Sequence, residues 1–244
     1  MFMSLASVRS PLLGRSVGVA LCAMSVALCP LLLHAQVGYR PDKSPFEDVK
    51  LGQSVSLSVG WLGLRRDIAG VAPKSAAFGQ LTYEAAVGGP ALLYARYTLA
   101  PTTRTLLAPA ANLPQRVTGT PGSTMHMFDG GLDIALTGKK SWRHLIPSVS
   151  GGVGVVTDFA KIDSGSYQFG VKFALTYGLA LRYIRASGVR FRVDLTNAMW
   201  QYEYPDRYFV KATDGTSILT NTQDRTIWRR NVGITAGVSV PIFK

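Results

Sequence analysis

Strict two-residue periodicity is the feature that most restricts what this sequence can fold into. In residues 168–184, QFGVKFALTYGLALRYI, every odd position from Phe169 to Tyr183 carries a large apolar or aromatic side chain, whereas most even positions carry Gly, Ala, Thr, Lys or Arg. Successive side chains of a β-strand point to opposite faces of the sheet. The pattern therefore predicts a strand with one apolar and one polar face.

The same alternation recurs along most of the chain. The eight expected strands cover residues 49–63, 77–88, 91–100, 126–137, 145–157, 168–184, 189–204 and 227–243. In the seventh of these the alternation weakens near Asn197, which predicts a β-bulge there. We find no convincing helical segment after the first 35 residues.

The connections between the expected strands alternate strictly in length. Short turns are expected at residues 88–90, 138–144 and 185–188, and long loops at 64–76, 101–125, 158–167 and 204–226. This order predicts an up-and-down meander with the short turns at one end and the long loops at the other, as in outer-membrane barrels. An even strand number returns both termini to the short-turn end, which is periplasmic in such barrels.

The two strand faces differ in a way that favours a membrane barrel over a soluble one. The polar face is rich in Gly, Ala and Ser rather than in the charged residues that a water-exposed surface would carry. Small side chains suit the narrow interior of an eight-stranded barrel. The apolar face has aromatic residues near the strand ends, where membrane barrels carry aromatic girdles.

The fold class follows from these two faces. Because lipid cannot satisfy backbone hydrogen bonds, a sheet that spans a membrane has to close on itself. Residues 49–244 are therefore predicted to form an all-β fold, an eight-stranded antiparallel up-and-down transmembrane β-barrel. A lipocalin-like soluble barrel with an apolar interior is the less favoured alternative.

The N-terminal segment predicts export from the cytoplasm. The first 15 residues contain two arginines and no acid, residues 16–33 are mostly apolar, and a small residue stands at Ala35. This arrangement predicts a signal peptide at residues 1–35, cleaved after Ala35, rather than a retained anchor. Both cysteines lie within it, so disulfide and thiolate chemistry are not expected in the mature chain. Residues 36–48, which contain two prolines, are predicted to form a periplasmic N-terminal tether.

An excess of positive charge suggests an anionic neighbour. The formal net charge is +12, and it falls to +10 when the two arginines of the expected signal are removed. For an exported protein this favours contact with lipid phosphate over nucleic acid. On the long-loop side, lipopolysaccharide contacts are predicted for Arg65, Arg66, Lys74, Arg207, Lys211, Arg225, Arg229 and Arg230. The alternative is an ordinary solvated rim.

Charges of both signs also occur on the polar face. Since buried charges are tolerated only when they are paired and hydrogen-bonded, we expect them to form one lumen network. Its expected members are Glu84, Arg96, Asp129, Asp133, Lys172, Arg182, Arg190, Arg192, Asp194 and Arg229. The network is interpreted as a structural plug, with the lining of a narrow ion path as the alternative.

The chain resembles a known family in several respects. The signal, the eight alternating strands, VRFRVDL at residues 189–195 and the terminal AGVSVPIFK are similar to small outer-membrane β-barrel proteins of the OmpA/OmpX-like superfamily. The resemblance implies a bacterial outer-membrane location and a C-terminal segment read by the barrel-insertion machinery. Members commonly end in Phe, whereas here Phe243 is followed by Lys244.

Catalytic and metal chemistry have little support in the sequence. After the signal only His126 and His144 remain, and the predicted topology places them towards opposite barrel ends, so no paired-histidine metal site is expected. A lipid A deacylase needs a serine two residues after its histidine, where this chain has Phe128. Calcium binding by the DGGLD stretch from Asp129 to Asp133 is less favoured than pairing with lumen arginines.

The functional expectation is accordingly a non-enzymatic one, with no cofactor and no metal. We expect a monomeric outer-membrane protein with a largely plugged lumen that acts in the envelope or through its long external loops. A narrow pore for ions or small solutes is the alternative, and a lipid A-modifying enzyme is the less favoured third reading.

Overall fold

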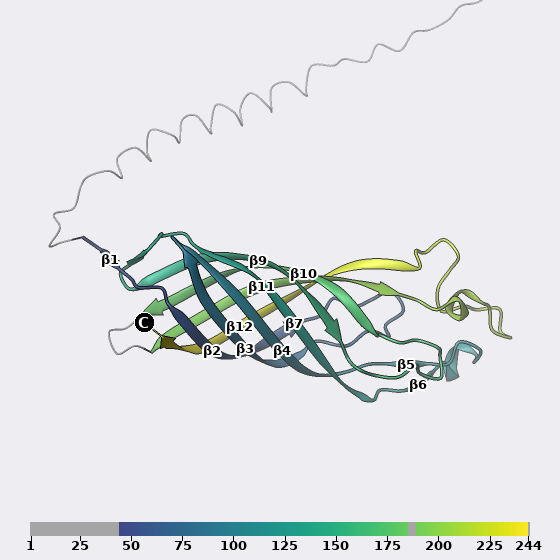
Figure 1. Cartoon of the computed structure of the whole chain (residues 1–244). Coiled ribbons are helices and arrows are strands. Elements are labelled where there is room, and N and C mark those ends of the chain that lie inside the picture. Colours follow the sequence, from purple (N-terminus) through teal and green to yellow (C-terminus); the bar gives the residue numbers. More distant parts are fainter. Residues whose placement is uncertain (1–43, 185–188, 244) are drawn as a thin grey trace, which may run out of the picture. The chain divides into compact units, whose positions relative to one another are not determined.

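Eight long antiparallel strands close into a barrel in the computed structural model, which describes residues 44–184 and 189–243. The strands are β2 (Gln53–Gly63), β3 (Ala76–Gly88), β4 (Ala91–Thr103), β7 (Gly122–Ala135), β9 (Leu145–Thr157), β10 (Val171–Ile184), β11 (Arg190–Glu203) and β12 (Thr226–Phe243). Each pairs with its neighbours in chain order, and β12 pairs with β2 to close the sheet (Figure 1). The predicted eight-stranded antiparallel up-and-down barrel is confirmed.

The two faces of the sheet have the predicted orientation. Leu57 and Leu179 point outward with 66% and 56% of their surface exposed, whereas the intervening side chains, such as Ser56 and Ala180, are buried inside. The register places Leu179 directly opposite Val149 on one side and Leu195 on the other, which continues the apolar surface around the barrel. The outer face is thus the apolar surface that a membrane-spanning barrel presents to lipid.

The sixth predicted strand begins later than its periodicity suggests. β10 starts at Val171, because Gly170 has a φ of +66°, a left-handed conformation that favours glycine and interrupts the extended chain. Phe169, expected on the apolar outer face, is instead fully buried in the interior. The prediction for Phe169 was therefore wrong.

The predicted bulge near Asn197 is also wrong. β11 pairs with β10 and with β12 without a register shift, and Ala198, Trp200 and Tyr202 continue the inward-facing side of the strand. The alternation weakens there because large aromatic side chains point inward. Register shifts occur instead next to Gly88 in β3 and Pro241 in β12.

Short elements decorate both barrel ends. At the short-turn end, β1 (Phe46–Asp48) pairs with β8 (Lys140–Trp142), so the described end of the expected tether is held by the turn at 138–144. At the other end lie β5 (Leu106–Leu107), η3 (Leu113–Gln115), β6 (Val117–Gly119) and η4 (Asp206–Phe209). β5 and β6 form a small hairpin within the expected loop 101–125.

Three sequence assignments lie wholly or partly outside the described residues. These are the signal at 1–35, most of the tether at 36–48 and the turn at 185–188. Among the described residues, no helix has the length and apolar character needed to cross a membrane.

Candidate functional site

A compact group of ion pairs fills the lumen near the short-turn end, and we call it the charge layer. The Arg182 Nη2 atom lies 2.8 Å from Glu84 Oε1 and 2.9 Å from Asp133 Oδ2. Arg192 also contacts Glu84, and its Nε donates to both Asp194 oxygens at 2.7 and 2.8 Å. All five side chains are nearly inaccessible to solvent. The strands β3, β7, β10 and β11 are thereby joined across the barrel interior.

A second ion pair lies further towards the long-loop end. Arg96 donates from Nε to Asp129 Oδ1 at 2.9 Å and from Nη2 to Oδ2 at 2.5 Å, a two-point contact. Thr176 donates to the same Asp129 oxygen at 3.0 Å and contacts the Tyr94 hydroxyl at 3.2 Å. The Arg96 guanidinium also lies 5.1 Å from the Tyr94 ring centre, within cation–π range.

Glycines make room for these side chains inside the barrel. A Cβ atom added to Gly152 would lie 2.4 Å from the Tyr94 hydroxyl and 2.4 Å from the carbonyl oxygen of Gly130. At Gly154 it would lie 2.2 Å from the carbonyl oxygen of Phe128. The glycine-rich stretch of β9 therefore serves lumen packing.

Three residues of the predicted lumen network lie outside these ion pairs. Lys172 Nζ is 3.6 Å from Glu203 Oε2 at the long-loop end. Arg190 donates to the carbonyl oxygen of Lys50 at 3.4 Å near the short-turn end. Arg229 lies opposite Trp200 in the strand register, in an aromatic rather than an ionic environment. The structure brings together Glu84, Arg96, Asp129, Asp133, Arg182, Arg192 and Asp194 in the charge layer and its neighbouring pair.

An aromatic layer, which the sequence analysis missed, fills the lumen at the long-loop end. Its buried members are Tyr167, Phe169, Trp200, Tyr202, Tyr204 and Tyr208. The ring centres of Tyr167, Tyr204 and Tyr208 are 6.4–6.5 Å apart in a triangle of stacked rings. Inward-facing apolar side chains of the strands complete this core, among them Leu62, Phe78, Ala100, Met125, Met127, Val156, Ala174 and Ala198.

The buried carboxylate of Asp67 ties a loop to the aromatic layer. Its oxygens accept hydrogen bonds from the backbone N–H groups of Ala69, Val71 and Ala72 at 3.0–3.3 Å. The hydroxyl of Tyr204 donates to it at 3.1 Å. Burial, followed by the Asp67 charge, raises the pKa of Tyr204 well above that of free tyrosine, so this hydroxyl keeps its proton.

Little space separates the two filled regions. A cavity of about 20 Å³ is lined by apolar residues of the aromatic core and by polar lumen residues, including Gln80, Thr98 and Asn231. This volume accommodates about one water molecule.

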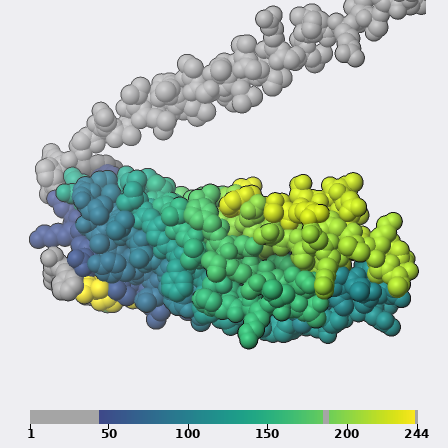
Figure 2. Space-filling view, turned by 45° about the vertical axis from the view of Figure 1, so that its right-hand side comes forward, coloured from purple at the N-terminus to yellow at the C-terminus, as the bar shows by residue number. Residues whose placement is uncertain are grey.

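The long loops are joined into one platform. Arg116 donates to the carbonyl oxygens of Thr216 and Ser217, each at 3.2 Å, and to the Thr216 hydroxyl at 2.7 Å. Segments 104–121 and 204–225 therefore lie side by side, as the teal-blue and yellow-green regions at one end of Figure 2 show. Arg104 pairs with Asp163 at 3.4 Å and adds the segment 158–170.

A second contact between the loops is made by Asp214. It accepts hydrogen bonds from the Thr216 hydroxyl at 2.6 Å, the Thr216 N–H at 3.0 Å and the Leu113 N–H at 2.8 Å. The Thr216 hydroxyl, then the two N–H groups, lower the pKa of Asp214 to about 2. Because this pKa is depressed, the contact is complete above the ordinary aspartate pKa and is lost only as the pH falls through about 2.

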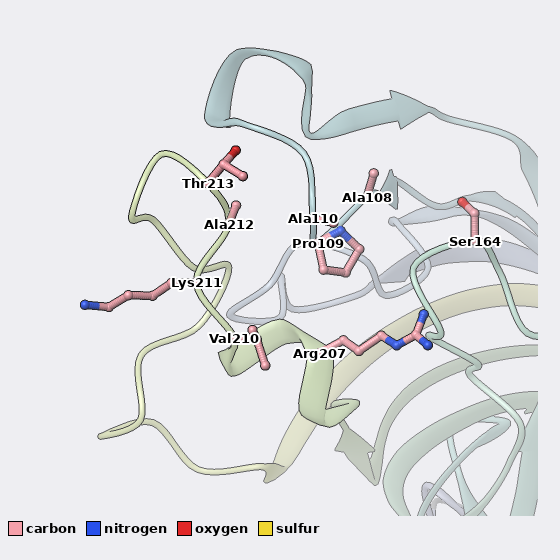
Figure 3. A pocket seen from close by; sticks show the side chains of 9 residues that line it. All are labelled: Ala108, Pro109, Ala110, Ser164, Arg207, Val210, Lys211, Ala212 and Thr213. Atoms are coloured by element: carbon pink, nitrogen blue, oxygen red, sulfur yellow. The ribbon is translucent and has the colours of Figure 1, made fainter.

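The predicted lipopolysaccharide-contacting residues are spread around the long-loop end. Arg66 and Lys74 line a cavity of about 500 Å³ within loop 64–76, and Arg207 and Lys211 line another of about 400 Å³ (Figure 3). Arg65 is exposed, and its backbone N–H donates to Asn231.

The remaining predicted rim residues have different surroundings. Arg225 pairs with Asp206. Arg230 is exposed on β12, two residues from the outward-facing Val232, whereas Arg229 is half-buried and faces inward. Four of the eight predicted rim residues therefore line a described cavity.

The two histidines lie at opposite ends of the described barrel. The Tyr97 hydroxyl is 2.8 Å from His126 Nδ1 on the outer surface, and the Tyr97 ring stacks on Phe128 at 4.5 Å. His144 lies 3.1 Å from Glu47 at the short-turn end. Among the described residues, no group of three or more potential metal ligands is found.

Comparisons with known proteins add a limited likeness of fold. No family model and no curated protein matches the sequence. Among solved structures, Neisserial surface protein A is 10% identical with a TM-score of 0.49, and the alignment covers 79% of this chain and 98% of that one. The outer membrane protein Ail of Yersinia pestis is 16% identical with a TM-score of 0.39, covering 78% and 99%. The outer membrane enzyme PagL is 15% identical with a TM-score of 0.37, covering 78% and 99%. At these identities and scores the similarities assign neither a family nor an activity to the chain.

Proposed function

We propose that this protein is an integral outer-membrane barrel that does not conduct and that acts through the platform formed by its long loops. Its outward side chains form an apolar surface of Leu, Val, Ile and Phe, which in water would be a strong aggregation liability. Lipid is the solvent that such a surface fits. We propose that the short-turn end faces the periplasm, so that both termini are periplasmic and the long loops are external.

The observation that carries the proposal is the double filling of the lumen. The charge layer crosses the barrel near one end, and the aromatic layer crosses it near the other. An ion following the axis would have to displace buried ion pairs and then a packed apolar core, both of which are costly. The filled lumen therefore favours a closed barrel over a pore, and the loops are the part of the molecule available to partners.

Lipopolysaccharide is the partner we propose for the rim. Arg66 and Lys74 form no ion pair among the described residues, and the nearby Asp67 is occupied by backbone N–H groups and Tyr204. Two free cations beside a cavity of about 500 Å³ suit phosphate groups, which bind Lys and Arg through charge-assisted hydrogen bonds. We further propose a monomer that is delivered by the barrel-insertion machinery and that binds no nucleic acid.

The enzyme alternative is not favoured by the surroundings of His126. This side chain contacts Tyr97 and lies beside the Phe159 ring, with ring centres 5.0 Å apart. The position two residues later carries the apolar Phe128 in place of a nucleophile. We therefore propose a binding rather than a hydrolytic role.

Planar-bilayer recording of the refolded protein tests the proposal. We expect the current to stay at the background of the protein-free bilayer at all applied voltages, because both lumen layers remain in place. A steady open channel would show that the lumen conducts and would favour the pore. In the same preparation, lipopolysaccharide binding should weaken in the Arg66→Gln, Lys74→Gln double variant.

A further inference from the structure

We infer that the cavity between the long loops binds a carboxylate at the end of a short aliphatic chain. The cavity of about 400 Å³ is formed by segments of three loops at residues 108–110, 164 and 207–213 (Figure 3). Its volume lies within the range typical of small-molecule sites. This ligand is chemically different from the lipopolysaccharide proposed for the rim, and its binding does not depend on the lumen being closed.

Arg207 supplies the positive charge of this cavity. In Figure 3 its side chain extends along the cavity to the side on which Ser164 lies, whereas the Lys211 side chain points away. Among the described residues, neither the side chain of Arg207 nor that of Ser164 makes a hydrogen bond or an ion pair. The guanidinium can therefore donate two parallel hydrogen bonds to a carboxylate, and the serine hydroxyl can donate a third.

The acids around the cavity do not neutralise Arg207, because each has another partner. Asp206, which directly precedes Arg207 in η4, pairs with Arg225. Asp163 pairs with Arg104 and accepts the N–H of Tyr167. Asp214 is held by Thr216 and Leu113, as described above. An anionic ligand thus meets the unpaired Arg207 guanidinium and no free carboxylate among the residues lining the cavity, while the second lining cation, Lys211, points away from it.

The remaining walls select the apolar part of the ligand. They are formed by the short side chains of Ala108, Pro109, Ala110, Val210 and Ala212, and by Thr213, whose hydroxyl already donates to Asn112 Oδ1 at 2.7 Å. These side chains bury methyl and methylene groups but offer neither an aromatic stacking surface nor a row of hydroxyl partners. A branched or linear chain of a few carbons suits them better than a sugar ring does.

One guanidinium also favours a singly charged ligand. A carboxylate is matched in charge and in planar geometry by one Arg side chain, whereas a phosphate dianion would retain uncompensated charge. The same carboxylate chemistry occurs in a free short-chain fatty acid and at the C-terminus of a peptide that ends in an aliphatic residue.

The walls are held in place before any ligand arrives. Arg116 links the segments 104–121 and 204–225, and the buried Arg104–Asp163 pair anchors the segment that carries Ser164. Tyr208, adjacent to Arg207, is fully buried in the aromatic layer. A preformed site does not have to order its loops on binding, which lowers the free-energy cost of association.

Titration by NMR of the protein in phospholipid nanodiscs tests this inference. The probes are 4-methylpentanoate, its uncharged amide, and N-acetyl-leucine as a mimic of a peptide C-terminus. We expect saturable binding of at least one carboxylate, and an affinity for the amide lower by about tenfold or more, the loss of one charge-assisted contact. Whichever of the two acids binds more tightly identifies the source of the carboxylate, a free acid or a peptide terminus.

Matched variants of the same loop complete the test. Arg207→Gln should lower the affinity for the carboxylate by about tenfold or more. Lys211→Gln removes a positive charge from the same loop, but because this side chain is directed away from the cavity, the affinity should change less than about twofold. Both residues are exposed, so neither variant should disturb the barrel. Three results would each overturn the inference. These are equal binding of acid and amide, equal effects of the two variants, and no binding of either acid at a ligand concentration of about 20 mM. These outcomes are independent of whether the barrel conducts.

Discussion

Glu84 is the residue on which the charge layer depends most, since it is shared by Arg182 and Arg192. Glu84→Gln would leave two buried guanidinium groups facing each other with less compensation. We expect the free energy of unfolding to fall by about 3–5 kcal/mol, the usual cost of breaking a buried ion pair from one side. Urea unfolding from lipid vesicles measures the difference.

The control for this variant is an exposed ion pair of the same protein. Asp206→Asn removes the partner of Arg225 at the solvent-exposed loop surface, where such pairs contribute under about 1 kcal/mol. A similar loss in both variants would mean that the charge layer has no special role in stability.

Two neighbouring glycines in β9 allow a sharper test of lumen packing. A methyl group at Gly152 would overlap with the Tyr94 hydroxyl and with the Gly130 backbone, whereas nothing lies within 4 Å of a Cβ atom at the outward-facing Gly151. We expect Gly152→Ala to cost about 1–3 kcal/mol through overpacking. Gly151→Ala should be neutral or slightly stabilising in the same unfolding experiment, and a comparable loss there would contradict the packing argument.

At the scale of elements, alternation predicts strands well wherever the two faces meet different surroundings. In the middle of β2, β3 and β4 the inward side is small or polar, as at Ser56, Thr82 and Thr98, and the outward side is apolar, so phase and orientation there follow directly from the sequence. The sequence likewise predicts that Arg96 and Asp129 belong to a lumen charge network, because isolated charges cannot be buried, but it does not predict that these two residues pair with each other.

Alternation loses this power where both faces are apolar. At the long-loop end of β11, Trp200 and Tyr202 point into the aromatic layer, so apolar side chains no longer mark the outward face. The layer itself is assembled from β11, from the loop that directly follows it and carries Tyr208, and from the more distant segment that carries Tyr167. No local sequence pattern predicts such contacts between separate segments. A single residue such as Gly170, with its left-handed backbone conformation, also ends the extended chain without any change in the surrounding composition.

The loop platform has its own weak point in Arg116. Arg116→Met would remove the hydrogen bonds to Thr216 and Ser217 while keeping much of the side-chain volume. Losing these hydrogen bonds should lower the free energy of opening the loops by about 1.5–3 kcal/mol, which corresponds to a roughly tenfold to hundredfold increase in the population of open loops. Limited proteolysis should therefore cut residues 104–121 and 204–225 faster.

The barrel itself should be unaffected by Arg116→Met, since Arg116 lies outside the eight long strands of the described chain. Lys211→Met serves as the matched control, because that side chain is exposed and makes no described contact between the loops. An unchanged cleavage rate in Arg116→Met would show that the platform is held by its remaining contacts.

At the scale of the whole molecule, the surroundings of the outer face are decisive. Leu179 points outward in the middle of β10, between Val149 and Leu195. In lipid, Leu179→Lys should lower the free energy of unfolding by about 2–4 kcal/mol, whereas a lysine near the membrane surface costs only about 0–1 kcal/mol. Leu136→Lys, next to a short turn, provides that comparison. Equal tolerance at both positions would indicate an outer face in contact with water.

The register shift beside Pro241 gives the cylinder a seam. Pro241 has no N–H group to donate, and the register shifts between it and Phe243, so the ladder is irregular at the edge where the last strand meets the first. Every other pairing of the eight long strands joins neighbours in the chain, but the pairing of β12 with β2 can form only after all the strands between them are in place. The seam is thus the natural place for the wall to part first and to be sealed last.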